Sequence, residues 1–186
     1  MKRLFVQNIL KNQKGITLVE LLLYMGIFST LLMVLVQLFG SIVSVNLESE
    51  ANSSVSQDGR YILNRLSYDI RQAVASSITA PAGLGTANAG STLSFNSSGG
   101  QAYTYFLSSD VDHPGLKDID VTTGGNTDRL NSIGTTISNL QFILMKSTAT
   151  TTPKYIVTVS FTLTSTTREQ KGYQTKNFQT TVGTRQ

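Results

Sequence analysis

The chain has 186 residues, a mass of 20.2 kDa and no cysteine, so disulfide bonds and thiolate metal sites are excluded. Its formal net charge of +4 arises before Gly15, where four basic and no acidic residues stand, while 11 basic and 11 acidic residues balance in the rest. A positive charge confined to one terminus indicates the orientation of a membrane span rather than a polyanionic partner.

A long uncharged segment follows this basic N-terminus. Residues 21–47 contain no charged side chain, and Gln37 is the most polar residue of their apolar part. About 25 helical residues are ~37 Å long, which exceeds the ~30 Å hydrocarbon core of a bilayer. A secretory signal peptide has a shorter apolar core that ends at a small-x-small cleavage site, and neither feature is present here. We therefore predict a transmembrane helix over residues 16–45.

The start of this helix carries the motif KGITLVE at residues 14–20, followed by the leucine-rich segment. It resembles the class III leader of type IV pilins and type II secretion pseudopilins. The resemblance implies that residues 1–15 are a cytoplasmic leader, that prepilin peptidase cleaves between Gly15 and Ile16, and that the new amino group of Ile16 is methylated. It also implies that Glu20 takes part in filament assembly. Ile16 departs from the family pattern, because most members have Phe or Met there.

The position of Glu20 also has a chemical explanation. A carboxylate inside a bilayer costs roughly 2.5–3.5 kcal/mol on insertion scales, so it needs a nearby cation. Cleavage would create one at Ile16, whose α-amino group is mostly protonated at neutral pH. Ile16 and Glu20 are one helical turn apart, and in a filament Glu20 of one subunit could instead neutralise the amine of the next. The alternative is an interfacial glutamate whose side chain reaches the headgroups.

Residues 46–77 are predicted to continue the helix outside the membrane. No proline occurs over residues 46–75, and Gly59 opposes helix formation by about 1 kcal/mol. An amphipathic stripe is formed by Ile62, Leu63, Leu66, Ile70, Ala73 and Val74. The polar residues expected elsewhere on the helix are Arg60, Asn64, Asp69 and Gln72. An Arg65–Asp69 pair adds a few tenths of a kcal/mol. The helix should run from about residue 17 to about residue 76, unbroken at Gln37, and end before the Pro- and Gly-rich residues 81–90.

Residues 78–186 are predicted to form an exported, β-rich head. Alternating apolar residues predict strands near residues 92–96, 102–107, 137–146, 154–165 and 178–182, with a turn at residues 97–100. Four or five short antiparallel strands need a cover for their apolar face, and the helical stripe can supply it. The predicted fold class is α+β. It is a pilin fold with a long N-terminal helix, transmembrane in its first half and amphipathic in its second, packed on a small antiparallel sheet.

The head offers few groups for chemistry. His113 is the only histidine, and no nucleophile-elbow or phosphate-loop motif occurs, so we predict no catalytic residues, no enzymatic activity and no cofactor.

Oxygen ligands suited to Ca²⁺ are Asp110, Asp112, Asp118, Asp120, Asn126 and Asp128. Their spacing fits no EF-hand loop, so we interpret residues 110–128 as a solvated polar loop without a metal. The basic residues of the last strands are Lys154, Arg168, Lys171, Lys176 and Arg185. Nucleic-acid binding there is a weakly supported alternative to scattered solubilising charge.

Together these features predict a minor pilin or pseudopilin subunit of a type IV pilus or type II secretion-like filament. The runs GRYILNRLSYDIRQA, YIVTVSFTLTS and FQTTVGTRQ resemble the W-type minor pilins and J-type minor pseudopilins in particular. The implied partners are prepilin peptidase, other pilin or pseudopilin subunits, the inner-membrane assembly platform and, before assembly, membrane lipid. The implied location is the bacterial cytoplasmic membrane, with a single pass and the head outside, and then the filament. The alternative is a single-pass, membrane-tethered extracytoplasmic enzyme or binding domain that does not polymerise. The sequence does not choose among adhesion, motility, DNA uptake and protein secretion.

Overall fold

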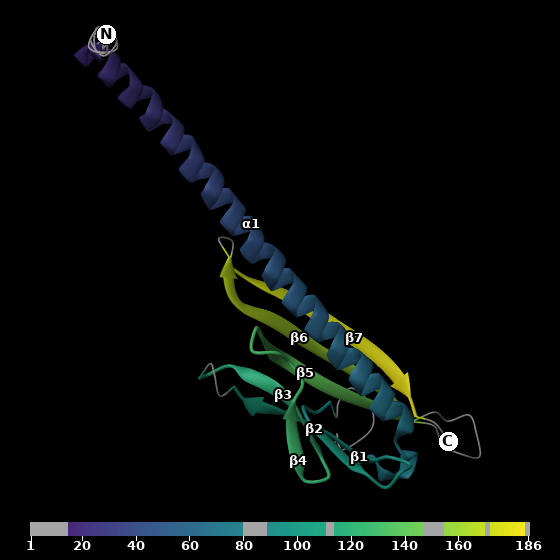
Figure 1. The fold of residues 1–186 in the computed structure, drawn as a ribbon. Coiled ribbons are helices and arrows are strands. Elements are labelled where there is room, and N and C mark those ends of the chain that lie inside the picture. Colours follow the sequence, from purple (N-terminus) through teal and green to yellow (C-terminus); the bar gives the residue numbers. More distant parts are fainter. Residues whose placement is uncertain (1–14, 80–88, 111–113, 147–154, 170–171, 185–186) are drawn as a thin grey trace, which may run out of the picture. The chain divides into compact units, whose positions relative to one another are not determined.

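The computed structural model describes residues 15–79, 89–110, 114–146, 155–169 and 172–184. The chain divides into two compact units, Met1–Val43 and Ser44–Gln186. A single helix, α1 (Leu18–Gln72), contributes to both units (Figure 1). The prediction of one continuous helix through Gln37 is confirmed.

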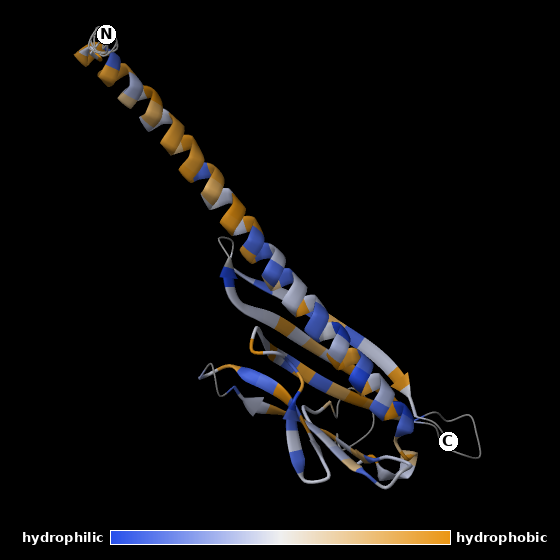
Figure 2. Ribbon diagram, viewed as in Figure 1, coloured by the Kyte–Doolittle hydropathy of each residue, from blue (hydrophilic) through white to orange (hydrophobic). Residues whose placement is uncertain are grey.

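In the first unit, the described residues of α1 are exposed around the whole circumference of the helix. Apolar residues dominate this part, as the orange ribbon in Figure 2 shows. Its large apolar side chains keep between 43% and 74% of their surface exposed. By length and composition this stretch could cross a membrane.

In the second unit, α1 is amphipathic. The residues that it buries there follow a spacing of three or four: Ala51, Val55, Gly59, Ile62, Leu66, Asp69 and Ile70. The predicted stripe is therefore confirmed at Ile62, Leu66 and Ile70 and extends further toward the N-terminus, but Val74 is wrong, because it lies beyond the end of α1 and is exposed. The helix ends at Gln72, and a short 3-10 helix, η2 (Ala75–Ser77), follows it. The predicted end near residue 76 includes this last irregular turn.

The first sheet contains β1 (Leu93–Asn96), β2 (Ala102–Ser109), β3 (Lys117–Thr123) and β4 (Asn126–Arg129), all antiparallel in the order β1-β2-β3-β4. The predicted hairpin of the first two strands is confirmed, and its turn has Gly100 at a φ of 80°. Only glycine adopts such a backbone conformation at little cost.

The second sheet contains β5 (Thr135–Lys146), β6 (Tyr155–Glu169) and β7 (Gly172–Gly183), antiparallel in the order β5-β6-β7. A bulge in β5 lies between Ser138 and Gln141, where Asn139 has a φ of 53°. Because side chains alternate between the faces of a strand, the extra residue reverses the alternation. Ile137 and Leu140, three residues apart, can therefore both be buried.

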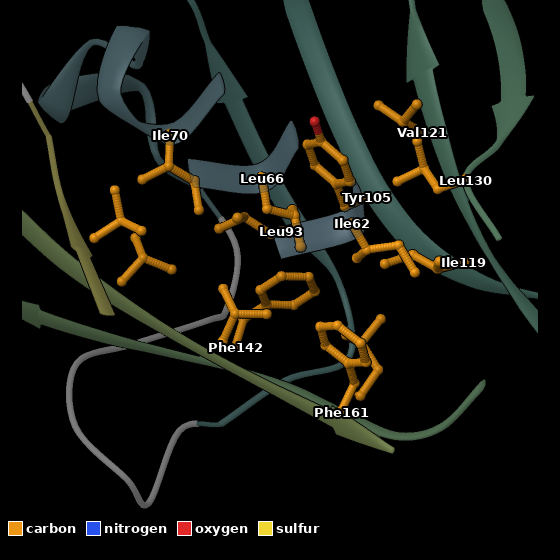
Figure 3. Packing of buried hydrophobic residues seen from close by; sticks show 14 of the residues in the cluster. Ile62, Leu66, Ile70, Leu93, Tyr105, Ile119, Val121, Leu130, Phe142 and Phe161 are labelled. Carbon is orange, nitrogen blue, oxygen red and sulfur yellow. The ribbon is translucent and has the colours of Figure 1, made fainter. Parts of the chain in front are cut away.

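One hydrophobic core joins the stripe of α1 to the inner faces of both sheets. Figure 3 shows Leu66 of α1 with Leu93, Tyr105 and Phe142 from β1, β2 and β5. The α+β fold class, a long N-terminal helix with antiparallel sheets, is thus confirmed. The predicted strand number is wrong, because the described residues form seven strands in two sheets, of which β6 has 15 residues.

The interpretation of residues 110–128 as a solvated polar loop is also wrong. Strands β3 and β4 occupy much of this segment, and Asp110 and Asp118 are buried. The side chain of Arg129 lies 3.0 Å from Asp118 and 3.7 Å from Asp110, and Asn131 Nδ2 donates to Asp118 at 2.8 Å. Burial raises the pKa of Asp118, whereas the hydrogen bond from Asn131 and the charge of Arg129 oppose the rise. The carboxylates are paired within the fold, which makes their burial tolerable.

Asp69 was expected on the polar side of α1, and this expectation is wrong as well. Its side chain is 2% exposed, accepts a hydrogen bond from Arg65 Nε at 2.8 Å and accepts another from the buried hydroxyl of Tyr105. Burial raises the pKa of Tyr105, and its hydrogen bond to Asp69 raises it further. The predicted Arg65–Asp69 pair therefore belongs to a buried contact between α1 and β2, not to a solvated helix surface.

A second acidic residue of α1 contacts the segment before β5. One carboxylate oxygen of Asp58 accepts hydrogen bonds from the Ser132 amide at 2.9 Å, from the Ser132 hydroxyl at 2.7 Å and from the Thr135 hydroxyl. Thr135 is fully buried. These hydrogen bonds connect Asp58 to residues that follow it by 74 and 77 positions in the chain.

Candidate leader-processing and assembly segment

The residues around the expected cleavage site lie outside any helix. Gly15, Ile16 and Thr17 precede the first residue of α1, and all three are exposed. Ile16 keeps 68% of its surface accessible, and no atom lies within 4 Å of the position that a Cβ would take at Gly15. Proteases generally need an accessible, non-helical peptide, and the Gly15–Ile16 bond meets both conditions.

Thr17 caps the N-terminus of α1. Its hydroxyl oxygen accepts a hydrogen bond from the backbone N–H of Glu20 at 3.3 Å, and its carbonyl accepts one from Leu21 at 3.1 Å. Thr17 is thus the N-cap residue and Glu20 the third residue of the helix, as in a capping box. A carboxylate in this turn also lies near the positive end of the helix dipole. The Thr-x-x-Glu pattern was visible in the sequence but was not used.

Tyr24 supplies a hydrogen-bond partner for Glu20 that was not predicted either. The phenol of Tyr24 donates to Glu20 Oε1 at 3.2 Å, one turn further along the helix. In the uncleaved chain Ile16 carries no free amine, so the expected ammonium partner does not yet exist. The i, i+4 spacing of the two residues is the signal that could have identified this contact.

The exposed apolar surface of α1 begins at its first residue, Leu18. From Leu18 to Val43, α1 presents large aliphatic and aromatic side chains on all sides. Gln37 is exposed within this surface, and its backbone carbonyl accepts a hydrogen bond from the Ser41 hydroxyl at 3.0 Å. The hydroxyl of Thr30 likewise donates to the Ile27 carbonyl at 2.8 Å. These hydroxyls are therefore satisfied within the helix, as an apolar environment requires.

The other candidate residues do not assemble into a site in the described structure. His113 and Asp112 lie outside the described residues, and among those described no three His, Asp or Glu side chains cluster as metal ligands do. Lys154, Lys171 and Arg185 also lie outside them. The ammonium of Lys176 donates to Asn52 and Ser56 of α1, so it packs against the helix. Of the five basic residues considered for the alternative of nucleic-acid binding, Arg168 is thus the only other one that the structure describes.

The comparison with protein families agrees with the motif at the N-terminus. Residues 10–36 match the family model described as the prokaryotic N-terminal methylation motif. No curated protein and no solved structure matches the chain significantly. The matched residues include Gly15, Ile16 and Glu20 and the first half of the apolar helix. The match supports a class III prepilin leader at this N-terminus, similar to that of type IV pilins and pseudopilins, and its processing by prepilin peptidase.

Proposed function

We propose that the chain is a minor pilin or pseudopilin that is made as a membrane-anchored precursor, trimmed, and built into a filament. Residues 1–15 are the cytoplasmic leader, residues 16–45 the transmembrane and assembly helix, residues 46–77 its amphipathic continuation, and residues 78–186 the exported head. Prepilin peptidase cuts between Gly15 and Ile16, and the new amino group of Ile16 is methylated. The assembly platform of the inner membrane and other pilin subunits then receive the trimmed chain.

One combination of features carries this proposal: a methylation motif joined to an apolar helix that its own chain leaves uncovered. Burying one large aliphatic side chain contributes about 1.5–3 kcal/mol. The many exposed aliphatic side chains of α1 therefore require an apolar environment. Lipid provides it before assembly, and the helices of neighbouring subunits provide it in the filament. An ordinary tether would need the lipid but not the motif.

Glu20 is the residue that links processing to assembly in this proposal. Before cleavage its carboxylate accepts a hydrogen bond from the Tyr24 phenol, while its backbone N–H donates to the hydroxyl of Thr17. After cleavage an ammonium group is available at Ile16 of the same subunit or of its neighbour. Because opposite charges attract strongly in a medium of low polarity, this pairing would favour one register between subunits.

The first test is the mass of the N-terminal peptide of the protein isolated from cells that contain an active prepilin peptidase. We expect the peptide to begin at Ile16 and to carry one additional methyl group. An intact Met1 in such cells would refute the proposal and would favour the alternative, a membrane-tethered extracytoplasmic domain that does not polymerise.

The second test separates insertion from assembly. Glu20→Ala should leave the amount of membrane-inserted protein unchanged and strongly reduce its recovery in sheared filaments. Glu48→Ala is the matched control, because Glu48 is also an exposed glutamate of α1 but lies beyond the apolar part. Equal recovery of both variants in filaments would contradict the assigned role of Glu20.

A further inference from the structure

The last strand of the second sheet has a long unpaired edge. Within the described residues β7 pairs with β6 alone, and it extends over 12 residues, about twice the usual strand length. Figure 1 shows β7 in yellow as the outermost strand of this sheet. An unpaired edge exposes a row of backbone N–H and C=O groups that can pair with another strand.

The register shows which residues of β7 present these groups. The amide of Thr184 donates to the Tyr155 carbonyl of β6 at 2.9 Å, and that of Gln174 donates to Ser165 Oγ at 3.3 Å. Backbone groups alternate in direction along a strand, so the even-numbered residues of β7 face β6. The residues whose backbone groups face the free edge are Tyr173, Thr175, Asn177, Gln179 and Thr181, and all five are exposed.

Side-chain contacts support this alternation independently. Thr181 and Thr158 have their hydroxyls 3.0 Å apart, and Thr162 donates to Asn177 at 2.8 Å. In an antiparallel pair, side chains approach most closely at positions that do not exchange backbone hydrogen bonds. Thr181 and Asn177 are therefore placed with their amides pointing away from β6.

The edge of β7 lacks the features that usually prevent strand pairing. The strand contains no proline, and the irregularity of the hairpin adds its extra residues to β6. The one charged residue of β7, Lys176, is directed at α1, where its ammonium donates to Asn52 and, at 2.9 Å, to Ser56. Natural proteins protect long edges with outward charges, prolines or bulges, and the described edge has none of these.

We propose that the edge of β7 is a docking surface for β7 of a second copy of this chain, paired antiparallel about a two-fold axis. Pairing centred on Phe178 places Asn177 opposite Gln179 and Thr175 opposite Thr181, so no like charges meet. Paired threonines stabilise antiparallel strands. The contact is isologous and closes on itself as a dimer. This inference does not depend on the proposed function.

The opposite edge of the same sheet explains why β7 pairs with β7 rather than with β5. Gly90 lies alongside β5, where its amide donates to the Phe142 carbonyl at 3.1 Å and its carbonyl accepts from the Phe142 amide at 2.7 Å. The middle of the β5 edge is therefore occupied. A head-to-tail array that joins β7 to β5 of the next copy would have to displace this contact.

The test uses the full chain in detergent micelles, with sedimentation equilibrium for the protein mass and amide hydrogen exchange resolved along β7. We expect a dimer in which the amides of the odd-numbered residues become protected as the protein concentration rises. Gln179→Pro removes an outward amide without removing a bond to β6, and Gln179→Lys adds charge at the edge. Each should weaken dimerisation roughly tenfold or more.

The matched control is Gln141→Lys. Gln141 is exposed and stands in the same row as Gln179, since both flank Ser160, but it belongs to β5. It adds the same charge to the same sheet, and the dimer should persist. A monomer at every concentration would overturn the proposal and would favour a different subunit as the partner. A dimer that both Gln179 variants leave intact, as contact through α1 would produce, would overturn it equally.

Discussion

Replacing Gly59 with alanine tests how closely α1 approaches the second sheet. A Cβ at this position would lie 2.2, 2.3 and 2.6 Å from three ring carbons of Phe178 in β7. The ring cannot easily retreat, because it stacks on Phe161 with centroids 5.5 Å apart, and Phe161 is 2% exposed. The sequence presents Gly59 only as an unfavourable helix residue. In the structure, its missing side chain is what allows the contact.

The two opposing effects can be compared in magnitude. Overpacking a core costs about 1–3 kcal/mol, and so close an approach to a stacked ring belongs to the upper part of that range, about 2–3 kcal/mol, whereas alanine is about 1 kcal/mol better than glycine inside a helix. We expect Gly59→Ala to lower the free energy of unfolding by about 1–2 kcal/mol. This corresponds to a thermal midpoint roughly 2–8 °C lower for a domain of this size. Loss of the far-ultraviolet circular dichroism signal of the full chain in detergent would measure it.

A double-mutant cycle with Phe178→Ala isolates the steric effect. Once the ring is absent, only the helix preference of alanine remains, so Gly59→Ala should then raise the midpoint. A reversal of sign between the two backgrounds is the expected result. An unchanged or higher midpoint for Gly59→Ala in the presence of Phe178 would refute the reasoning.

Substitutions at three further positions test the buried polar contacts by thermal unfolding. Asp58→Ala removes the acceptor for the amide and hydroxyl of Ser132 and should cost about 2–3 kcal/mol, with a smaller loss for Asp58→Asn. Because burial raises the pKa of Tyr105, its stabilising effect is present below the unfolded value of 10.0 and is lost as the pH rises above it. Tyr105→Phe should therefore flatten the decline of the midpoint between about pH 9 and pH 11. Arg129→Leu leaves Asp118 buried without its cation and should cost roughly 3–5 kcal/mol at neutral pH. Since the pKa of Asp118 is already raised by burial, the folded chain takes up a proton first on acidification, so this deficit should shrink near about pH 4.

The sequence predicted those elements whose apolar residues follow a simple period. The stripe from Ile62 to Ile70 repeats every three or four residues, and large apolar residues occupy every second position of β6 from Tyr155 to Leu163, so both were found. Strand β5 illustrates the limit, because its bulge at Asn139 reverses the alternation partway along. A search for alternating apolar residues therefore identifies the buried face on only one side of such a bulge.

The polar parts of the head could not be predicted in the same way. Strand β3 carries Asp118, which reads as a loop residue because aspartate is rarely buried in strands. Its partner Arg129 is 11 residues away, and no local pattern connects the two. At the N-terminus the motif was sufficient to locate Gly15, Ile16 and Glu20. The hydrogen bond from Tyr24 was not predicted, because a carboxylate in an apolar helix suggests a cationic partner, whereas the phenol is a neutral donor.

The contacts of α1 with β7 have a consequence for the order in which the protein is made. Lys176 meets Asn52 across 124 residues of chain, and Phe178 covers Gly59 from a similar separation. Ribosomes synthesise polypeptides from the N-terminus, so the apolar side of α1 emerges long before the strand that shields it. Native structures dominated by such distant contacts form slowly, and exposed apolar surface invites aggregation in the interval. Translation products that stop short of β7 should therefore be degraded by cellular proteases rather than accumulate as stable fragments.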